Sequence, residues 1–302
     1  MAHHMNCSVG VPKISVIIPV YNGVDYISQA INSALVQTET EIEVIVVNDG
    51  STDETGKAVL EINDRRIRLI NQANAGVSAA RNAGIDASSG EWLAFLDADD
   101  VWFPSKLAIQ SQWFERADIV AGNAKILGSQ TNLLPRWKLD DLNLRQIYHL
   151  LEGGTPPLSS VCVRRSAVRE NRFDDSLKFG EDLEFWLRLV AQGATLYASD
   201  EPVYEYRVHS MSATSITNEP TLLLARLLRQ FGTMETLPRR IRRAAHKSAG
   251  RNYCSSVRIA LTEHPITVGR LLQFLWNGTL FHANPARIVC IAMQHSYRRK
   301  TP

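Results

Sequence analysis

Four short runs of β-branched and other apolar residues alternate with helical patterns in the first third of this 302-residue chain. The apolar runs are 14–18, 42–47, 67–70 and 92–96, and the helical patterns are 25–37, 53–62 and 76–87. Alternation of this kind predicts an α/β fold, in which a largely parallel sheet is covered by helices on both faces. Ligands of such sheets bind beyond the carboxyl ends of the strands.

Polar residues follow three of these predicted strands. They are Asn48-Asp49-Gly50-Ser51 after the second strand, residues 71–76 after the third, and Asp97-Ala98-Asp99 after the fourth. The carboxyl ends of parallel strands meet at one edge of the sheet, so we expect these three segments to form one site.

Asp97 and Asp99 lie two residues apart at the end of a buried strand, and they therefore share one side of an extended backbone. Two carboxylates that lie so close repel each other unless a cation lies between them. Mg²⁺ and Mn²⁺ prefer oxygen ligands and use one or two carboxylates together with substrate phosphates. A plain acidic turn, with Asp100 or Ser105 capping the next helix, is the alternative interpretation.

Five segments occur in an order and spacing that resembles the family 2 inverting glycosyltransferases, which have the GT-A fold. They are 14–22, 47–53, 74–82, 96–100 and 180–186, and the resemblance covers about residues 12–210. It implies a Rossmann-like, mostly parallel sheet flanked by helices, and it implies sugar transfer from a nucleoside diphosphate.

The resemblance implies a nucleotide site in the first half of the chain. Its residues are Pro19, Val20, Tyr21, Asn22, Asp49, Asn74, Gly76, Arg81, Asp97 and Ala98. Asp49 would accept a hydrogen bond from a pyrimidine ring N–H, which uracil and thymine offer and cytosine does not. This favours a UDP- or dTDP-sugar without excluding guanine nucleotides. A turn-capping role for Asp49 and a surface ion pair for Arg81 are the alternatives.

The same resemblance implies a catalytic metal and a base. Asp99 would be the main ligand of Mn²⁺ or Mg²⁺, with Asp97 and His209 beside it, and Arg207 would share the charge of the diphosphate. Asp182 would deprotonate the acceptor hydroxyl, and Glu181 would orient the acceptor or Asp182. The alternative is that both acids only stabilise the start of a helix.

The sequence predicts three regions. Residues 1–11 look like a tag or a disordered N-terminus, and 12–216 would form the glycosyltransferase domain, with a nucleotide-sugar half at 12–117 and an acceptor half at 118–216. Residues 217–302 form a helical segment, with 14 lysines and arginines against 3 acidic residues from position 219 onward.

Four widely spaced cysteines, and the absence of any long uninterrupted apolar stretch, suggest a cytoplasmic protein without a membrane span. The basic clusters 239–247 and 298–300 could nevertheless bring it to the inner face of an anionic membrane. A solvated helix face that contacts the acidic body is the alternative. No nucleic-acid-reading motif is present, so we expect no nucleic-acid partner.

These features predict a metal-dependent inverting glycosyltransferase that acts on a glycan or lipid-linked acceptor in cell-surface polysaccharide assembly. The Gln-x-x-Arg-Trp signature of processive synthases is missing, since Leu133 stands where Gln is needed before Arg136-Trp137. That favours addition of one sugar or a few. A nucleotidyltransferase is disfavoured by the absence of basic residues in the loop 19–24. A non-catalytic nucleotide-sugar-binding scaffold remains an alternative.

Overall fold

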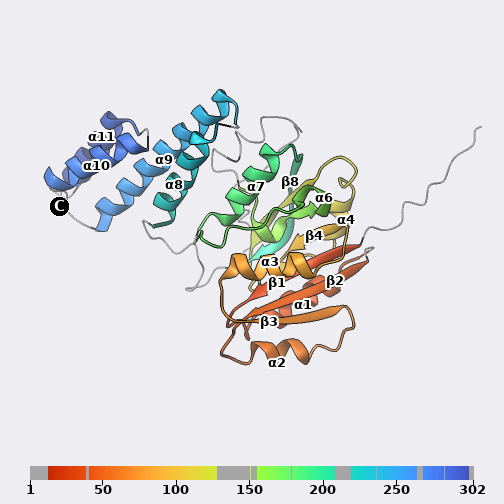
Figure 1. Ribbon diagram of the computed structural model, residues 1–302. Coiled ribbons are helices and arrows are strands. Elements are labelled where there is room, and N and C mark those ends of the chain that lie inside the picture. The colour runs from red at the N-terminus through yellow and green to blue at the C-terminus, as the bar shows by residue number, and fades with distance from the viewer. Residues whose placement is uncertain are drawn as a thin grey trace, which may run out of the picture. The chain divides into compact units, whose positions relative to one another are not determined.

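A computed structural model gives the structure of this protein (Figure 1). It describes residues 13–38, 41–127, 150, 155–177, 179–207, 219–235, 237–263, 268–281 and 283–298. The chain forms two compact units: the first combines 1–143, 156–175 and 192–208, and the second combines 144–155, 176–191 and 209–302. The predicted boundary at 216–217 and the predicted tag at 1–11 lie outside the described residues.

One eight-stranded sheet organises the first unit, with the strand order β3-β2-β1-β4-β7-β6-β8-β5. The strands are β1 (Ile14–Val20), β2 (Ile42–Asp49), β3 (Ile67–Gln72), β4 (Trp92–Phe95), β5 (Val101–Trp102), β6 (Ile119–Ile126), β7 (Cys162–Arg164) and β8 (Leu196–Tyr206). Strands β1 to β4 are parallel, as predicted. The other half is mixed, because β7 runs antiparallel to both β4 and β6, β5 runs antiparallel to β8, and β6 is parallel to β8.

Helices cover both faces of the parallel half. Helix α1 (Ile27–Leu35) packs on the face formed by alternate residues of β1, such as Val16 and Ile18. Helix α2 (Thr55–Leu60) contacts α1 and lies beside β2 and β3. On the other face, Ala80 of α3 (Val77–Ala87) packs against Ile45 and Val47 of β2. Both faces of β1 and β2 are therefore buried, which explains their nearly continuous apolar sequence, whereas the edge strand β3 is partly exposed.

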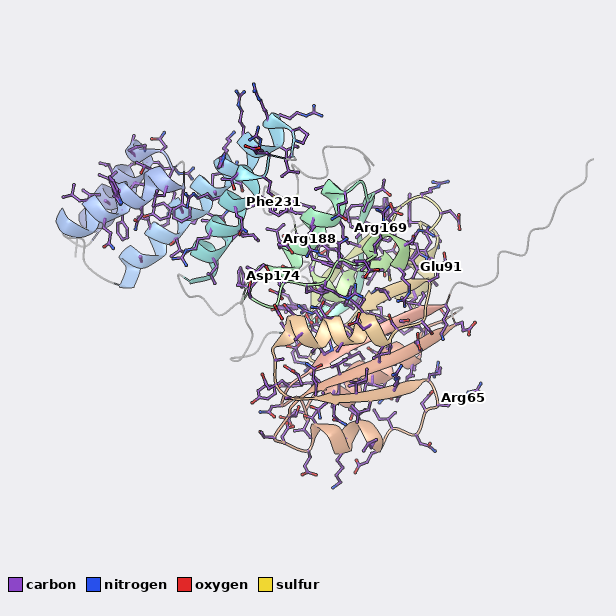
Figure 2. The ribbon with its side chains drawn as sticks, in the orientation of Figure 1. Arg65, Glu91, Arg169, Asp174, Arg188 and Phe231 are labelled. Carbon is purple, nitrogen blue, oxygen red and sulfur yellow. The ribbon has the colours of Figure 1, made fainter. Side chains whose placement is uncertain are left out.

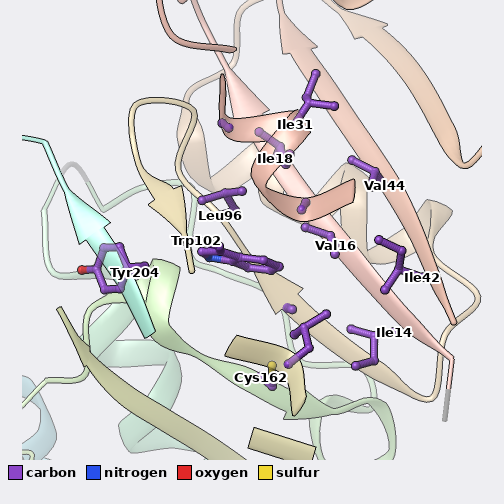
Figure 3. Close-up of a cluster of buried hydrophobic side chains, with 14 of the residues drawn as sticks. Ile14, Val16, Ile18, Ile31, Ile42, Val44, Leu96, Trp102, Cys162 and Tyr204 are labelled. Carbon is purple, nitrogen blue, oxygen red and sulfur yellow. The ribbon is translucent and has the colours of Figure 1, made fainter. Parts of the chain in front are cut away.

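The core extends from the parallel half into the mixed half (Figure 3). Ile14, Val16 and Ile18 line one side of the cluster, and Trp102 and Tyr204 continue it toward β5 and β8. In the described part of this unit, the remaining secondary structure is α4 (Lys106–Ser111), the short 3₁₀ helix η1 (Leu158–Ser160) and α6 (Arg165–Val168).

Lys106 is fully buried inside this core. Its amine donates to Gln110 Oε1, lies 3.6 Å from Cys162 Sγ, and lies 4.3 Å from the centre of the Trp102 ring. Burial lowers the pKa of Lys106 and raises that of Cys162. Gln110 donates to the carbonyls of Val120 and Ser160, so this polar cluster links α4, β6 and η1.

Replacing Gly84 with alanine should destabilise the first unit. A Cβ at this position of α3 would lie 2.4 Å from Ile17 Cγ2, so the helix would have to move away from β1. We expect a loss of about 1–3 kcal/mol in the free energy of unfolding, measured by urea denaturation. Because Ile17→Ala removes the clashing methyl group, the double variant should lose less than the sum of the two single variants. Strict additivity would contradict this close contact.

The second unit is helical in its described part. It contains α7 (Glu181–Ala191), α8 (Glu219–Thr233), α9 (Arg239–Glu263), α10 (Val268–Leu280) and α11 (Pro285–Arg298). Figure 2 labels Arg188 on α7 and Phe231 on α8, and a second core lies where α9, α10 and α11 meet. There Ile288 of α11 approaches Gly278 of α10 so closely that a Cβ on the glycine would lie 2.5 Å from it.

None of the described helices combines the length and the apolarity that a membrane span requires. Cys162, Cys254 and Cys290 are free thiols.

Candidate active site

The four parallel strands bring the predicted nucleotide residues to one edge of the sheet. Strand β1 lies between β2 and β4, so the chain passes from β1 through β2 to β3 on one side and then crosses to β4 on the other. Such a reversal of strand order is the place where open α/β sheets bind ligands. Tyr21 and Asn22 follow β1 at this reversal, and Asp97 and Ala98 follow β4.

The loops after β1 and β2 are tied together by hydrogen bonds. The Asn22 N–H donates to Ser51 Oγ at 2.9 Å, and the Thr52 N–H donates to Asn22 Oδ1 at 2.7 Å. Asn22 has a φ of 50°, a left-handed conformation that asparagine tolerates better than most residues. Pro19 and Val20 end β1, and Tyr21 beside them is exposed. These bonds hold the rim of the site in one conformation and leave the Tyr21 ring accessible.

Asp49 holds the loop that contains Asn74 and Gly76. Its Oδ1 accepts from Gln72 Nε2 at 2.7 Å and from the Ala75 N–H at 2.9 Å, and its Oδ2 accepts from the Gly76 N–H at 2.8 Å. These contacts differ from the turn-capping alternative, because Asp49 binds the 72–76 loop, whereas the Ser51 N–H donates to Asn48 Oδ1. Asp49 is buried, and a carboxylate offers about four acceptor positions, so these three bonds leave one position unused.

Changing Asp49 to asparagine should therefore destabilise the protein even without nucleotide. An asparagine keeps one acceptor oxygen but turns an N–H₂ group toward one of the loop N–H donors. We expect the free energy of unfolding to fall by about 1–3 kcal/mol in urea denaturation. Leu60→Gln, on an exposed side chain of α2, serves as the control and should change little. Unchanged stability of the Asp49 variant would contradict the loop-holding role.

Arg81 reaches the end of β4 from α3. Its Nη2 donates to Asp97 Oδ1 at 3.0 Å, and its guanidinium lies 5.5 Å from the centre of the Phe173 ring. The Arg81 side chain is only 6% exposed, whereas that of Asp97 is 37% exposed. The Arg81 guanidinium therefore offsets part of the charge of Asp97 from the buried side, while the Asp97 carboxylate stays partly accessible.

Hydrogen bonds from two other parts of the chain fix the turn from Asp97 to Asp100. Ser159 Oγ accepts from the Asp97 N–H at 3.0 Å and donates to Asp100 Oδ2 at 2.6 Å. Arg207, just after β8, donates from its N–H to Asp100 Oδ1 at 3.2 Å and from its Nε to the Asp99 carbonyl at 2.9 Å. Both residues fix the direction in which Asp97 and Asp99 leave the sheet.

Asp100 is buried beneath this turn. Burial, together with the negative charges of Asp97 and Asp99, raises the pKa of Asp100 to about 8. Hydrogen bonds from Ser159 and from the Arg207 N–H act in the opposite direction. The turn therefore concentrates negative charge, and a cation beside Asp97 and Asp99 would relieve part of the repulsion.

The residues at this turn fit a divalent cation that is shared with a substrate. Among the described residues, no three His, Cys, Asp or Glu side chains gather around one point. Mg²⁺ needs only one or two carboxylates when phosphate oxygens complete its coordination, and Asp97 and Asp99 supply that set. His209, the predicted third ligand, lies outside the described residues.

Glu181 and Asp182 begin α7 in the second unit. The Leu183 N–H donates to Asp182 Oδ1 at 2.7 Å, and Glu184 in the same turn pairs with Arg188 at 2.7 Å. Three acids in the first turn suit the positive end of a helix dipole. The catalytic roles of Asp182 and Glu181 remain predictions.

Two features of the site were not predicted. Ser159 lies about 60 positions along the chain from the turn that it braces, and nothing in its sequence context marks it. Arg207, for which a diphosphate contact is predicted, also contacts the acidic turn, Gln29 Oε1 at 2.7 Å and the Tyr26 ring at 4.9 Å, and these contacts were not predicted. The Arg-x-His context at 207–209 was the signal that singled out Arg207.

Comparison with known proteins identifies the family. The model of "Glycosyl transferase family 2" matches residues 15–171, which include β1 to β4 and the Asp97–Asp100 turn. This chain belongs to glycosyl transferase family 2. A relative from Nostoc sp., described as an uncharacterized glycosyltransferase, is 34% identical over 236 residues, covering 68% of this chain and 69% of the relative. The uncharacterized glycosyltransferase EpsJ of Bacillus subtilis is 31% identical over 233 residues, covering 70% of this chain and 66% of EpsJ.

Solved glycosyltransferases share the fold. TarS of S. aureus, in a structure with UDP-GlcNAc, aligns with a TM-score of 0.68 at 22% identity, covering 93% of this chain and 84% of the TarS chain. The mannosyltransferase PcManGT of Pyrobaculum calidifontis, in complex with GDP-Man and Mn²⁺, aligns with a TM-score of 0.61 at 16% identity, covering 97% and 89%. The predicted GT-A fold of this family 2 glycosyltransferase is thus confirmed, with a more mixed sheet than the sequence suggested.

Proposed function

We propose that this glycosyltransferase moves a sugar from a UDP- or dTDP-sugar to a hydroxyl of a glycan or lipid-linked acceptor, with inversion at the anomeric carbon. The observation that carries the proposal is the Asp97–Asp100 turn at the strand-order reversal, where Arg81 stands behind Asp97 at 3.0 Å. A buried cation and partly exposed carboxylates at this edge suit a metal-chelated diphosphate.

Asp182 is the base in this proposal. Its carboxylate takes the proton of the acceptor hydroxyl while that oxygen bonds to the anomeric carbon, and the bond from this carbon to the diphosphate oxygen breaks with its electron pair on the diphosphate. A single displacement from the opposite face inverts the anomeric centre. Glu181 orients the acceptor or Asp182.

Asp99 and Asp97 hold Mn²⁺ or Mg²⁺ in this proposal, and His209 is a third ligand. Such an ion, when bound, acts as a Lewis acid on the departing diphosphate, with an effect of several kcal/mol. The Mn²⁺ and GDP-Man in the PcManGT complex support the use of a divalent ion. Arg81 and Arg207 add positive charge behind and beside the turn.

The preference for uracil or thymine rests on Asp49. The UDP-GlcNAc in the TarS complex supports a uridine nucleotide as the donor. The GDP-Man in the PcManGT complex makes a guanine nucleotide the alternative donor. Pro19, Val20, Tyr21, Asn22, Asn74, Gly76 and Ala98 would line the base, the ribose and the diphosphate.

Thermal unfolding with UDP, dTDP, GDP and CMP, each with and without Mn²⁺, tests the donor. A nucleotide at 100 times its Kd stabilises by about 2.7 kcal/mol, which raises Tm by roughly 4 °C for a protein of this size. We expect a shift that requires both UDP or dTDP and the metal. No shift with any nucleotide would contradict the donor site and favour a non-catalytic scaffold.

We also propose that the basic cluster 239–247 of α9 meets an anionic membrane that carries a lipid-linked acceptor. Arg239, Arg240, Arg243 and Lys247 are exposed at the start of α9, and each lysine or arginine near an anionic surface contributes about 1 kcal/mol. The cluster 298–300 would add to this contact. A variant with glutamine at these four α9 positions should lose binding to phosphatidylglycerol vesicles and keep its response to nucleotide.

A further inference from the structure

Helix α10 carries an apolar row on its exposed side. Leu272, Trp276 and Leu280 are spaced four residues apart, so they lie on one face of the helix. Their exposed fractions are 61%, 72% and 44%, and they are among the most exposed large apolar residues of the described chain. We call these three residues the α10 stripe.

The α10 stripe is not the face that holds the helix in the fold. Leu271, Phe274 and Leu275 pack against the core shared with α9 and α11, and the Tyr253 hydroxyl of α9 donates to the Phe274 carbonyl at 3.1 Å. Phe274 lies nearly opposite Leu272, because the two are about 200° apart around the helix, and Leu271 and Leu275 flank Phe274 on the packed side. The α10 stripe is therefore free to contact a partner.

The charge around the α10 stripe restricts what that partner can be. Residues 264–302 contain five arginines and lysines and no aspartate or glutamate. Arg258 of α9 and Arg287 of α11 are exposed on the two helices that contact α10. A second copy of this chain would bring like charges together at such a surface, whereas an anionic lipid surface would attract it.

We propose that the α10 stripe inserts into the interface of an anionic bilayer, with Trp276 at the headgroup level. Leucine and tryptophan on one face of a helix that lacks acidic residues are the features of helices that lie in a membrane surface. Tryptophan favours this depth because its ring is apolar and its N–H is polar. This inference rests on the membrane contact proposed for 239–247 of α9, and it assigns the insertion of apolar side chains to α10.

Flotation of the full chain with vesicles tests the insertion. We expect binding to phosphatidylcholine vesicles that contain phosphatidylglycerol and little binding to phosphatidylcholine alone. The double variant Leu272→Gln/Trp276→Gln should bind the anionic vesicles at least about tenfold more weakly, because the apolar contribution is lost. Leu60→Gln removes an apolar side chain that is 73% exposed in the first unit, and it should bind as the wild type does.

Trp276→Phe provides a second readout that does not depend on affinity. Lipids with brominated acyl chains should quench part of the tryptophan emission of the wild type. Trp276→Phe keeps an apolar ring, so it should bind the anionic vesicles while losing most of that quenching. Quenching that persists in Trp276→Phe would show that another tryptophan inserts, and it would overturn the proposal.

Other outcomes also separate the two proposals. A Leu272→Gln/Trp276→Gln variant that binds vesicles as the wild type does, while the 239–247 variant does not, would overturn the α10 insertion and leave the α9 contact.

A wild-type dimer that the double variant converts to a monomer in the absence of lipid would make the stripe an interface between copies, which also overturns the proposal. The thermal response to UDP and Mn²⁺ should be the same in the double variant and the wild type, so a failure of the donor proposal appears there and not in flotation.

Discussion

Replacing Asp182 with asparagine should lower the rate of sugar transfer by about 10²–10⁴-fold, the usual contribution of a general base. Asparagine retains the size of the side chain and an acceptor for the Leu183 N–H, which lies 2.7 Å from Asp182 Oδ1. It cannot take a proton from the acceptor hydroxyl. Stability and nucleotide affinity should therefore change little, and a transfer assay combined with UDP titration calorimetry measures both effects.

Glu184→Gln is the matched control for Asp182→Asn. Glu184 belongs to the same first turn of α7, but it is bonded to Arg188 within the helix. Its replacement should weaken α7 slightly and leave transfer within about a few-fold of the wild type, since an ion pair spaced i,i+4 contributes only about 0.3–0.5 kcal/mol. If the Asp182 variant retains full activity, a different group removes the acceptor proton.

Asp99→Asn should also lower the rate of sugar transfer strongly. An amide ligand carries no charge, so the variant should bind Mn²⁺ poorly and lose about 100-fold or more of the transfer rate. Its affinity for UDP should become independent of metal, which calorimetry with and without Mn²⁺ would reveal. Glu61→Gln, which also removes one negative charge from an exposed position, is the control and should retain the metal dependence. Metal-dependent binding that persists in Asp99→Asn would contradict the assignment of this ligand.

The parallel half of the sheet could be predicted from sequence mainly because β1, β2 and β4 are buried on both faces. The run 42–47 has no polar residue except Glu43, and the structure confirms it as part of β2. The position of Asp97 and Asp99 followed from the same argument, since a buried strand that ends at Leu96 must deliver them to the edge where Asp49 also lies.

The mixed half was harder to predict because its pairing is decided by contacts between distant residues. Residues 158–164 form η1 followed by β7, and the Ser160 N–H donates to the Pro157 carbonyl at 2.9 Å. Strand β6 continues across Gly122 and Asn123, because β8 pairs along nearly all of it. Neither outcome has a local signal in the sequence.

The hydrogen bonds within the site could not be predicted either, because they join residues that are far apart in the chain. In the sequence, Asp49 and Gly50 look like an ordinary Asp-Gly turn. In the structure, Asp49 accepts a hydrogen bond from the Ala75 N–H, 26 positions further along the chain. Asp100 looked like a possible helix cap, whereas its carboxylate is buried between Ser159 and the Arg207 N–H. Residue type and spacing predict which groups meet at a strand end, but not which of them face inward.

Electron paramagnetic resonance of Mn²⁺ tests the central claim most directly, because it detects the ion rather than an effect on activity. We predict that the wild type with UDP or dTDP removes the signal of free Mn²⁺ in a one-to-one titration. The wild type without nucleotide should remove much less, and Asp99→Asn with nucleotide should do no more than nucleotide alone. A free-ion signal that the wild type leaves unchanged with both nucleotides would contradict a metal-chelated diphosphate at the Asp97–Asp100 turn.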